Sequence, residues 1–152
     1  MKKTLLAVAL LGMSASAAAN SLVYGGVSIG QSDLDGNTDT AYNIHAGTSL
    51  FPLPFVGMEL GYTAHGSLAG EDVDSLYFAA RPSIGFGPLR LYGKVGAHSW
   101  EADSDDGFDA MYGFGADYQV FGPVNVGAEF MIYNVDKEEI SNFALTASFN
   151  FL

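Results

Sequence analysis

The chain has 152 residues and a formal net charge of −11, because 17 acidic residues outnumber only 6 basic ones. This excess of acid excludes nucleic-acid binding, which requires basic surface patches. The absence of cysteine excludes disulfide bonds, thiolate metal sites and an N-terminus lipidated in the manner of bacterial lipoproteins.

Residues 1–19 have the pattern of a cleaved secretory signal peptide. Lys2 and Lys3 precede an apolar run over 5–11, and the small residues over 14–19 suit signal peptidase. The apolar run is too short to cross a bilayer, which takes about 20 residues. The sequence therefore predicts an exported chain with one domain over residues 20–152.

The exported part has the pattern of an all-β domain. It is rich in glycine and has neither a long apolar run nor a helical repeat of apolar residues. Period-two alternation predicts eight strands, at 22–31, 40–51, 55–64, 75–83, 89–99, 111–121, 124–133 and 141–152. Short turns at 51–54, 85–88 and 122–123 alternate with longer acidic loops at 32–39, 65–74, 100–109 and 134–139.

The last predicted strand indicates how the sheet closes. Phe143, Leu145 and Phe149 alternate with small polar residues, so this strand has one apolar face. A chain that ends in such a strand leaves an unpaired edge, which aggregates unless another strand covers it. We therefore expect the last strand to pair with the first in a closed antiparallel up-and-down barrel.

The distribution of charge predicts which face of the barrel meets lipid. Fourteen of the 17 acids fall in the four predicted loops, and only six charged residues fall in strands, all on the glycine-rich face. Six charges are too few to solvate the outside of a soluble barrel. We therefore expect a transmembrane barrel with apolar residues and two aromatic girdles facing lipid, and polar residues filling the lumen.

Four stretches, GMELGY, LYGKVGA, MYGFGADY and VGAEF, begin at residues 57, 91, 111 and 126. Together and in this order they resemble the OmpA-like family of eight-stranded outer-membrane barrels. The alternating aromatics that end at Phe149, Phe151 and Leu152 resemble the signal by which such barrels are recognised by the barrel-assembly machinery. The resemblance implies a barrel alone, without the peptidoglycan-binding domain that some members carry.

The six strand charges are predicted to form a paired network in the lumen. They are Glu59, Arg81, Arg90, Lys94, Asp117 and Glu129. If Leu60 pairs with Ala80 on the outside, Glu59 faces Arg81 inside, and Arg90 follows beside Arg81. Lys94 then opposes Asp117, with Glu129 on the neighbouring strand. Unpaired buried charges are costly, so these groups are expected to pair.

Several other polar residues are candidates for metal binding or catalysis. His45 and His98 fall on the lumen face and His65 in a loop, none at metal-ligand spacing, so no metal, cofactor or catalytic site is predicted. A lipid-modifying enzyme would need a set such as His98, Ser99 and a loop acid at the outer rim. The loop over 100–109 could bind divalent cations weakly through Asp103, Asp105, Asp106 and Asp109.

These observations predict a small Gram-negative outer-membrane protein with a structural or surface-interaction role, a plugged lumen and acidic extracellular loops. A monomer in contact with outer-membrane lipid and lipopolysaccharide is expected, with no physiological partner identified. Two alternatives stay open: a small non-specific pore and a lipid-modifying outer-membrane enzyme.

Overall fold

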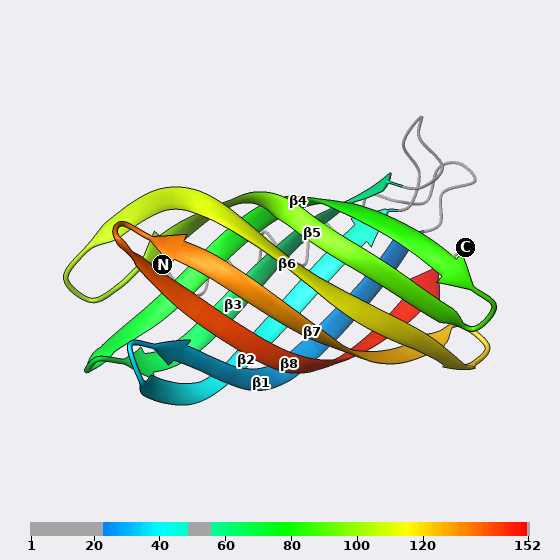
Figure 1. Ribbon diagram of the computed structural model, residues 1–152, viewed down its shortest axis with the longest axis horizontal. Helices are drawn as coiled ribbons and strands as arrows, with labels where there is room; N and C mark the ends of the chain where they lie inside the picture. The colour runs from blue at the N-terminus through cyan, green and yellow to red at the C-terminus, as the bar shows by residue number, and fades with distance from the viewer. Residues whose placement is uncertain (1–22, 49–55, 152) are drawn as a thin grey trace.

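The computed structural model describes residues 23–48 and 56–151, which form one closed antiparallel barrel (Figure 1). The strands follow one another around the barrel in chain order, and β1 pairs with β8 along Val23–Asp33. Their bounds are β1 Val23–Leu34, β2 Asn37–Thr48, β3 Val56–Leu68, β4 Glu71–Phe86, β5 Leu89–Glu101, β6 Asp106–Phe121, β7 Val124–Val135 and β8 Glu138–Phe151. The predicted eight-stranded up-and-down barrel and the pairing of the last strand with the first are confirmed.

The described part of the chain contains no helix long and apolar enough to cross a membrane. The expected signal peptide at 1–19, the turn at 51–54 and Leu152 lie outside the described residues.

The two ends of the barrel carry different turns. At one end, Gly87-Pro88 and Gly122-Pro123 connect β4 to β5 and β6 to β7, and the C-terminal end of β8 lies beside them (Figure 1). At the other end, the chain turns at 35–36, 69–70, 102–105 and 136–137. This second end is called the acidic end here, because it carries most of the carboxylates.

The prediction of long acidic loops is wrong. Three of the four connections at the acidic end have only two residues, and the strands continue through most of the predicted loops. Asp35 and Gly36 both have positive φ, of 51° and 84°, as do Ala69 and Gly70. Positive φ at both central residues is the type I′ geometry, which matches the twist of the flanking strands and lets them extend to the turn.

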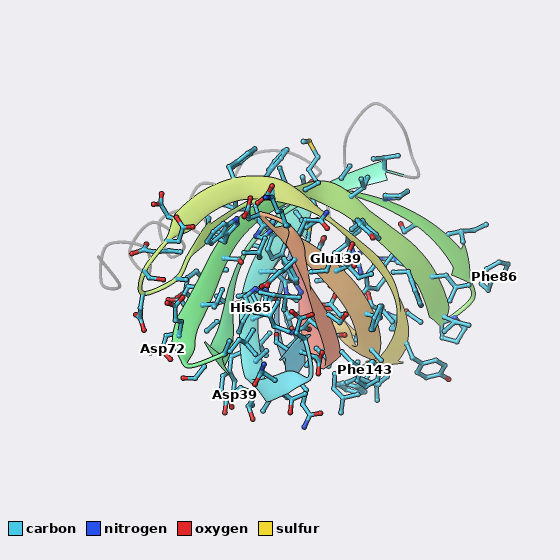
Figure 2. The ribbon with its side chains drawn as sticks, turned by 60° about the vertical axis from the view of Figure 1, so that its left-hand side comes forward. Asp39, His65, Asp72, Phe86, Glu139 and Phe143 are labelled. Atoms are coloured by element: carbon cyan, nitrogen blue, oxygen red, sulfur yellow. The ribbon has the colours of Figure 1, made fainter. Side chains whose placement is uncertain are left out.

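Over most of their length the strands are apolar outside and polar inside, as predicted. Val27, Ile29 and Phe114 are exposed on the outer wall, whereas Glu59 and Asp117 are buried in the lumen. Tyr42, Tyr112 and Phe143 are exposed on the outer wall towards the acidic end, where a girdle was expected. Figure 2 shows His65 inside the barrel and Phe86 and Phe143 on its outer side.

Beyond this aromatic level the polarity of the wall inverts. The outward positions become polar or acidic, for example Asp74 and Glu101, while the inward positions become apolar. A buried apolar cluster begins here and continues down to the level of Glu59, with which Ala79 pairs in register. Its members are Leu34, Leu68, Val73, Tyr77, Ala79, Met111, Met131, Tyr133 and Ile140. We call the part of the barrel beyond the aromatic level the collar. It has the polarity of a water-soluble barrel, with an apolar core and a charged exterior.

Candidate functional site

The lumen contains a network of buried charges centred on Lys94. Lys94 Nζ lies 2.6 Å from Glu59 Oε1 and 2.7 Å from Glu129 Oε2. The three residues belong to β5, β3 and β7, and their side chains are nearly fully buried. One ammonium thus bridges two carboxylates across the interior of the barrel.

A second cation, Arg81, joins the same network. Its Nη2 donates a hydrogen bond to Asp117 Oδ2 at 2.5 Å, and its guanidinium carbon lies 3.7 Å from the centre of the Tyr92 ring. Arg81 Nε is 3.6 Å from Glu59 Oε2, within ion-pair distance, but it makes no hydrogen bond to a described residue. The arginine is therefore held by one strong charge-assisted bond and by stacking on an aromatic face.

Tyrosine hydroxyls complete the carboxylate shells, a role that the sequence did not reveal. Tyr24 and Tyr77 donate to the two oxygens of Glu59 at 2.6 and 2.7 Å, and Tyr92 donates to Glu129 at 3.1 Å. Three carboxylates contact only two cations here, so these neutral donors stabilise the excess negative charge. The alternation of residues along each strand places all three tyrosines on the lumen face, and this was the one indication in the sequence.

The expected pairings within the network are partly wrong, because the register of β3 against β4 differs from the one assumed. Leu60 pairs with Phe78, not with Ala80, so Ala79 lies opposite Glu59. The difference accompanies a β-bulge between Ala64 and Ser67. Glu59 and Arg81 still approach each other, but diagonally.

Two further expected contacts do not occur. Arg90 pairs in register with Gly85 on β4 and does not lie beside Arg81, and among the described residues it makes no ion pair. Lys94 contacts the two glutamates and not Asp117, which bonds Arg81. Five of the six predicted lumen charges therefore come together, and Arg90 is half-buried outside the contacts.

Nearer the acidic end, a chain of hydrogen bonds crosses the lumen. It runs through Asn142, Ser32, His65, Ser75, His98 and the main-chain oxygen of Asn134, with successive distances of 2.8, 2.9, 3.0, 3.0 and 2.7 Å. We call it the His–Ser chain. His65, expected in a loop, is fully buried on β3 at its centre, so that expectation is wrong.

Donor and acceptor counting gives the His–Ser chain a single direction. The carbonyl of Asn134 can only accept, so His98 Nε2 carries a hydrogen, and neutral His98 then accepts from Ser75 at Nδ1. The same reasoning makes His65 donate from Nε2 to Ser75 and accept from Ser32 at Nδ1. Neither imidazole is in an ion pair with a described residue, and a buried unpaired charge is costly, so both are neutral.

Tyr133 closes the space between the two imidazoles. Its ring meets those of His65 and His98 edge-on, at centroid distances of 4.7 and 5.2 Å, and its hydroxyl lies 3.2 Å from Thr63 Oγ1. The polar chain is thereby packed against the buried apolar cluster, of which Tyr133 is also a member. The lumen is filled at this level by satisfied, tightly packed side chains.

The candidate catalytic set of His98 and Ser99 is not assembled. His98 points into the lumen and is fully buried, whereas Ser99, the next residue along β5, is exposed on the outer wall. Successive strand residues face opposite sides, so these two side chains are separated by the barrel wall. Ser75 does contact both imidazoles, but it is 1% exposed and cannot be reached by a lipid substrate from outside.

The expected cation-binding loop is also rearranged. Asp103 and Asp105 lie in the four-residue turn, but Asp106 and Asp109 belong to β6. Asp109 Oδ2 accepts hydrogen bonds from Trp100 Nε1 at 2.8 Å and from the amide of Asp136 at 2.9 Å. In the described parts of the chain, no three His, Asp or Glu residues are grouped so that they could hold a metal ion.

Asp109 lies at the tip of the collar, outside the membrane-spanning part, because it bonds the turn between β7 and β8. The amide of Asp136 and the indole of Trp100 both donate to its carboxylate and hold its pKa below the ordinary value of 3.8. One oxygen of this carboxylate is therefore engaged in holding the turn between β7 and β8.

The proposed assembly residues lie on the outer wall near the Gly-Pro turns. Phe149 and Phe151 are exposed there, and their rings are 4.9 Å apart. Both belong to the part of β8 that pairs with the first residues of β1, Val23 to Gly25.

Comparison with known proteins agrees with this architecture. The model of the family described as "Outer membrane protein beta-barrel domain" matches residues 4–151. The chain belongs to this outer-membrane barrel family. No curated protein sequence matches it.

Several solved structures share the fold of this outer-membrane barrel. Neisserial surface protein A has 14% identity and a TM-score of 0.64, over 86% of this chain and 97% of that one. The N-terminal barrel of Pseudomonas aeruginosa OprF has 17% identity and a TM-score of 0.61, over 87% and 100%. The outer-membrane enzyme PagL has 13% identity and a TM-score of 0.53, over 83% and 98%. At these identities the likeness concerns the fold alone, which hosts both enzymes and other proteins.

Proposed function

We propose that this outer-membrane barrel is a non-conducting protein with a structural or surface-interaction role, which presents its acidic collar at the cell surface. The observation that carries the proposal is the filled lumen. Three sets of side chains fill it: the network around Lys94, the His–Ser chain and the buried apolar cluster. An eight-stranded barrel is just wide enough to be filled by side chains in this way.

Conductance in planar lipid bilayers tests the proposal against the small pore. The wild-type barrel should give no steady current. Leu68→Ser with Ile140→Ser, which puts hydroxyls in place of two fully buried members of the apolar cluster, should give more current than the wild type if that cluster is the seal. Steady step-like currents through the wild-type protein would overturn the proposal.

Catalysis is the second rival, since PagL shows that the fold can carry an enzyme. Against it stands the separation of His98 from Ser99 by the barrel wall, together with the burial of Ser75. Mass spectrometry of outer-membrane lipids from cells with and without the protein is the direct test. A lipid species that depends on the protein and is lost in a Ser75→Ala variant would show that the protein is an enzyme that uses Ser75. A species that persists in this variant would point to another catalytic group.

The family and the surface of the barrel support a proposal about its surroundings. We propose that it is inserted by the barrel-assembly machinery, with Phe149 and Phe151 in the recognised strand, and that it stands in the membrane as a monomer. Its outer wall would contact outer-membrane lipid, and its collar would contact lipopolysaccharide. Two copies that approach through their collars would bring like charges together, which supports the monomer.

A further inference from the structure

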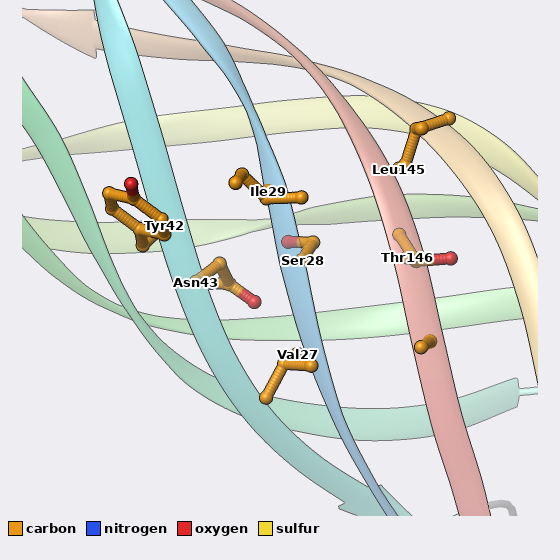
Figure 3. Close-up of a pocket in the computed structure, with 8 residues that line it drawn as sticks. Val27, Ser28, Ile29, Tyr42, Asn43, Leu145 and Thr146 are labelled. Carbon is orange, nitrogen blue, oxygen red and sulfur yellow. The ribbon is translucent and has the colours of Figure 1, made fainter.

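A groove of about 400 Å³ runs along β1 on the outer wall of the barrel (Figure 3). Val27 and Ile29 lie along it, Tyr42 borders it on β2, and Leu145 and Ala147 border it on β8. Ser28, Asn43 and Thr146 also line it, although their side chains are buried on the lumen side. Because these three can reach the outer wall only through their main chain, the floor of the groove is backbone and its walls are apolar side chains.

The groove lies on the part of the wall that faces the hydrocarbon core of the membrane. Val27, Ile29 and Leu145 are each half or more exposed, on the wall that is apolar below the aromatic level. Tyr42 stands at that level and pairs in register with Ile29, so its hydroxyl marks the membrane interface at the upper end of the groove. A hollow of this position and lining suits the hydrocarbon chain of a lipid.

The wall above the groove differs from the wall on the far side of the collar. Directly above it the outward residues are neutral, since Gln31 pairs with Thr40 on β2 and with Phe143 on β8. The first carboxylate over the groove, Asp33, is one outward position higher on β1. A phosphorylated headgroup above the groove would therefore meet an amide and a hydroxyl first.

The far side of the collar would repel such a headgroup. There Asp74, Glu101 and Asp106 lie side by side on β4, β5 and β6, paired in register on the outer wall. Three adjacent carboxylates at this height disfavour a phosphate by like-charge repulsion. The groove and the neutral wall above it therefore lie on the same side of the barrel. A surface that contacted lipids without preference would not need this arrangement.

We propose that the groove over β8, β1 and β2 is a binding site for one acyl chain of a membrane lipid, from the leaflet at the acidic end, with the headgroup against Gln31 and Thr40. A second copy of the barrel is the less suitable occupant. A convex barrel wall cannot fill a narrow concave groove, and the acidic collars of two copies would repel each other. The proposal depends on membrane insertion and not on the closed lumen.

Native mass spectrometry tests the site. Barrels reconstituted with phosphatidylethanolamine and phosphatidylglycerol would be extracted into mild detergent and examined for retained lipid. Ala147→Phe fills the groove from its edge, and Ala116→Phe makes the same change on the outer wall of β6, away from the groove. Retained lipid should fall about tenfold in Ala147→Phe, because burial of two methylene groups contributes roughly that factor, and should be unchanged in Ala116→Phe.

Further measurements keep the test decisive. Heat-modified migration in gels checks that each variant is folded, and Val27→Phe provides a second way to fill the groove. Glycerophosphoethanolamine, which has the headgroup without acyl chains, should not be retained. The proposal would be overturned if Ala147→Phe and Ala116→Phe retained the same amount of lipid, whether that amount is high or low. Retention of the chain-free headgroup would also overturn it.

The absence of native cysteine allows the rival occupant to be examined as well. Ile29→Cys places one thiol in the groove, and Leu91→Cys places one on the lipid-facing wall of β5. Disulfide-linked dimers in vesicles that form faster through position 29 than through position 91 would assign the groove to a second copy and overturn the acyl-chain site. Equal or slower linking through position 29 supports it.

Discussion

Lys94 and Glu59 form an ion pair of 2.6 Å although β4 separates their strands in the barrel wall. The pair therefore reaches across the lumen and does not follow the wall. Because Lys94 also holds Glu129, one side chain ties β3, β5 and β7 together through the interior.

Removing the charge of Lys94 should destabilise the barrel. Lys94→Met leaves two buried carboxylates without their shared cation, and we expect a loss of about 3 kcal/mol in the free energy of unfolding. Urea unfolding in lipid vesicles measures the loss. Arg90→Met is the matched control, because this half-buried lumen base makes no ion pair with a described residue, and it should cost less than about 1 kcal/mol. Equal losses in the two variants would contradict the network.

Ser75 should matter more than its small size suggests. Ser75→Ala removes the hydroxyl that links the two imidazoles and leaves a buried donor and a buried acceptor unsatisfied, which costs about 2 kcal/mol. Ser99→Ala, on the exposed outer face, should be nearly neutral. Thermal unfolding of both variants in the same detergent provides the comparison, and a neutral Ser75→Ala would mean that the His–Ser chain is not a structural element.

The direction of the His–Ser chain can be measured directly. Nitrogen-15 NMR should show His65 and His98 as neutral imidazoles with hydrogen on Nε2, since only this arrangement satisfies every member of a neutral chain that ends on the Asn134 carbonyl. Hydrogen on Nδ1 of either ring would contradict the assigned direction.

The row of three acids in the collar should be locally unfavourable. Glu101 pairs with Asp74 on one side and with Asp106 on the other, and like charges directly opposite in a sheet destabilise it. Glu101→Gln should therefore stabilise the barrel by roughly 0.5 kcal/mol at low ionic strength, and the gain should shrink in high salt. Glu138→Gln, at the start of β8, serves as the control. A gain that is independent of salt would rule out charge repulsion as its cause.

Asp109 should titrate unusually low, and the single tryptophan can report it. Its folded-state pKa lies below 3.8, so its contribution to stability is complete above about pH 4 and is lost as the pH falls through the folded value. Trp100 fluorescence should change in that acidic range, because Asp109 accepts the indole hydrogen bond. Asp109→Asn should abolish the change. A transition at or above pH 4 would mean that the carboxylate does not accept these two hydrogen bonds.

The membrane-spanning half of the barrel was largely predictable from sequence. Alternation placed Phe143 and Phe149 outside and Glu59 and Asp117 inside, because hydrocarbon and a filled lumen impose opposite chemistry on the two faces. Pairing between strands was harder to predict. One bulge between Ala64 and Ser67 changes which residues of β3 face inward, so that Leu68 is buried beyond it, and nothing in the apolar pattern fixes such an offset.

The collar is not predicted from the sequence, because its acidic stretches are typical of loops. Asp35-Gly36 is a strong hairpin signal, and Leu34 and Ile140 continue the lumen-facing phase of their strands. The polarity on each face reverses there, so an expectation of apolar outside and polar inside ended the strands too early. The Ser32, Ser75 and Asn142 contacts could not have been found from the sequence, since they depend on this continuation and on the register.

The reversal of polarity along each strand has a mechanical consequence. Pushing the barrel deeper would draw Asp74 and Glu101 into hydrocarbon, while raising it would lift exposed Phe143 and Tyr112 into water. Both displacements are opposed by steep costs, so the barrel is anchored at one immersion depth. A bilayer of a different thickness would have to thicken or thin around the barrel, so the protein would set the local thickness of the membrane that surrounds it.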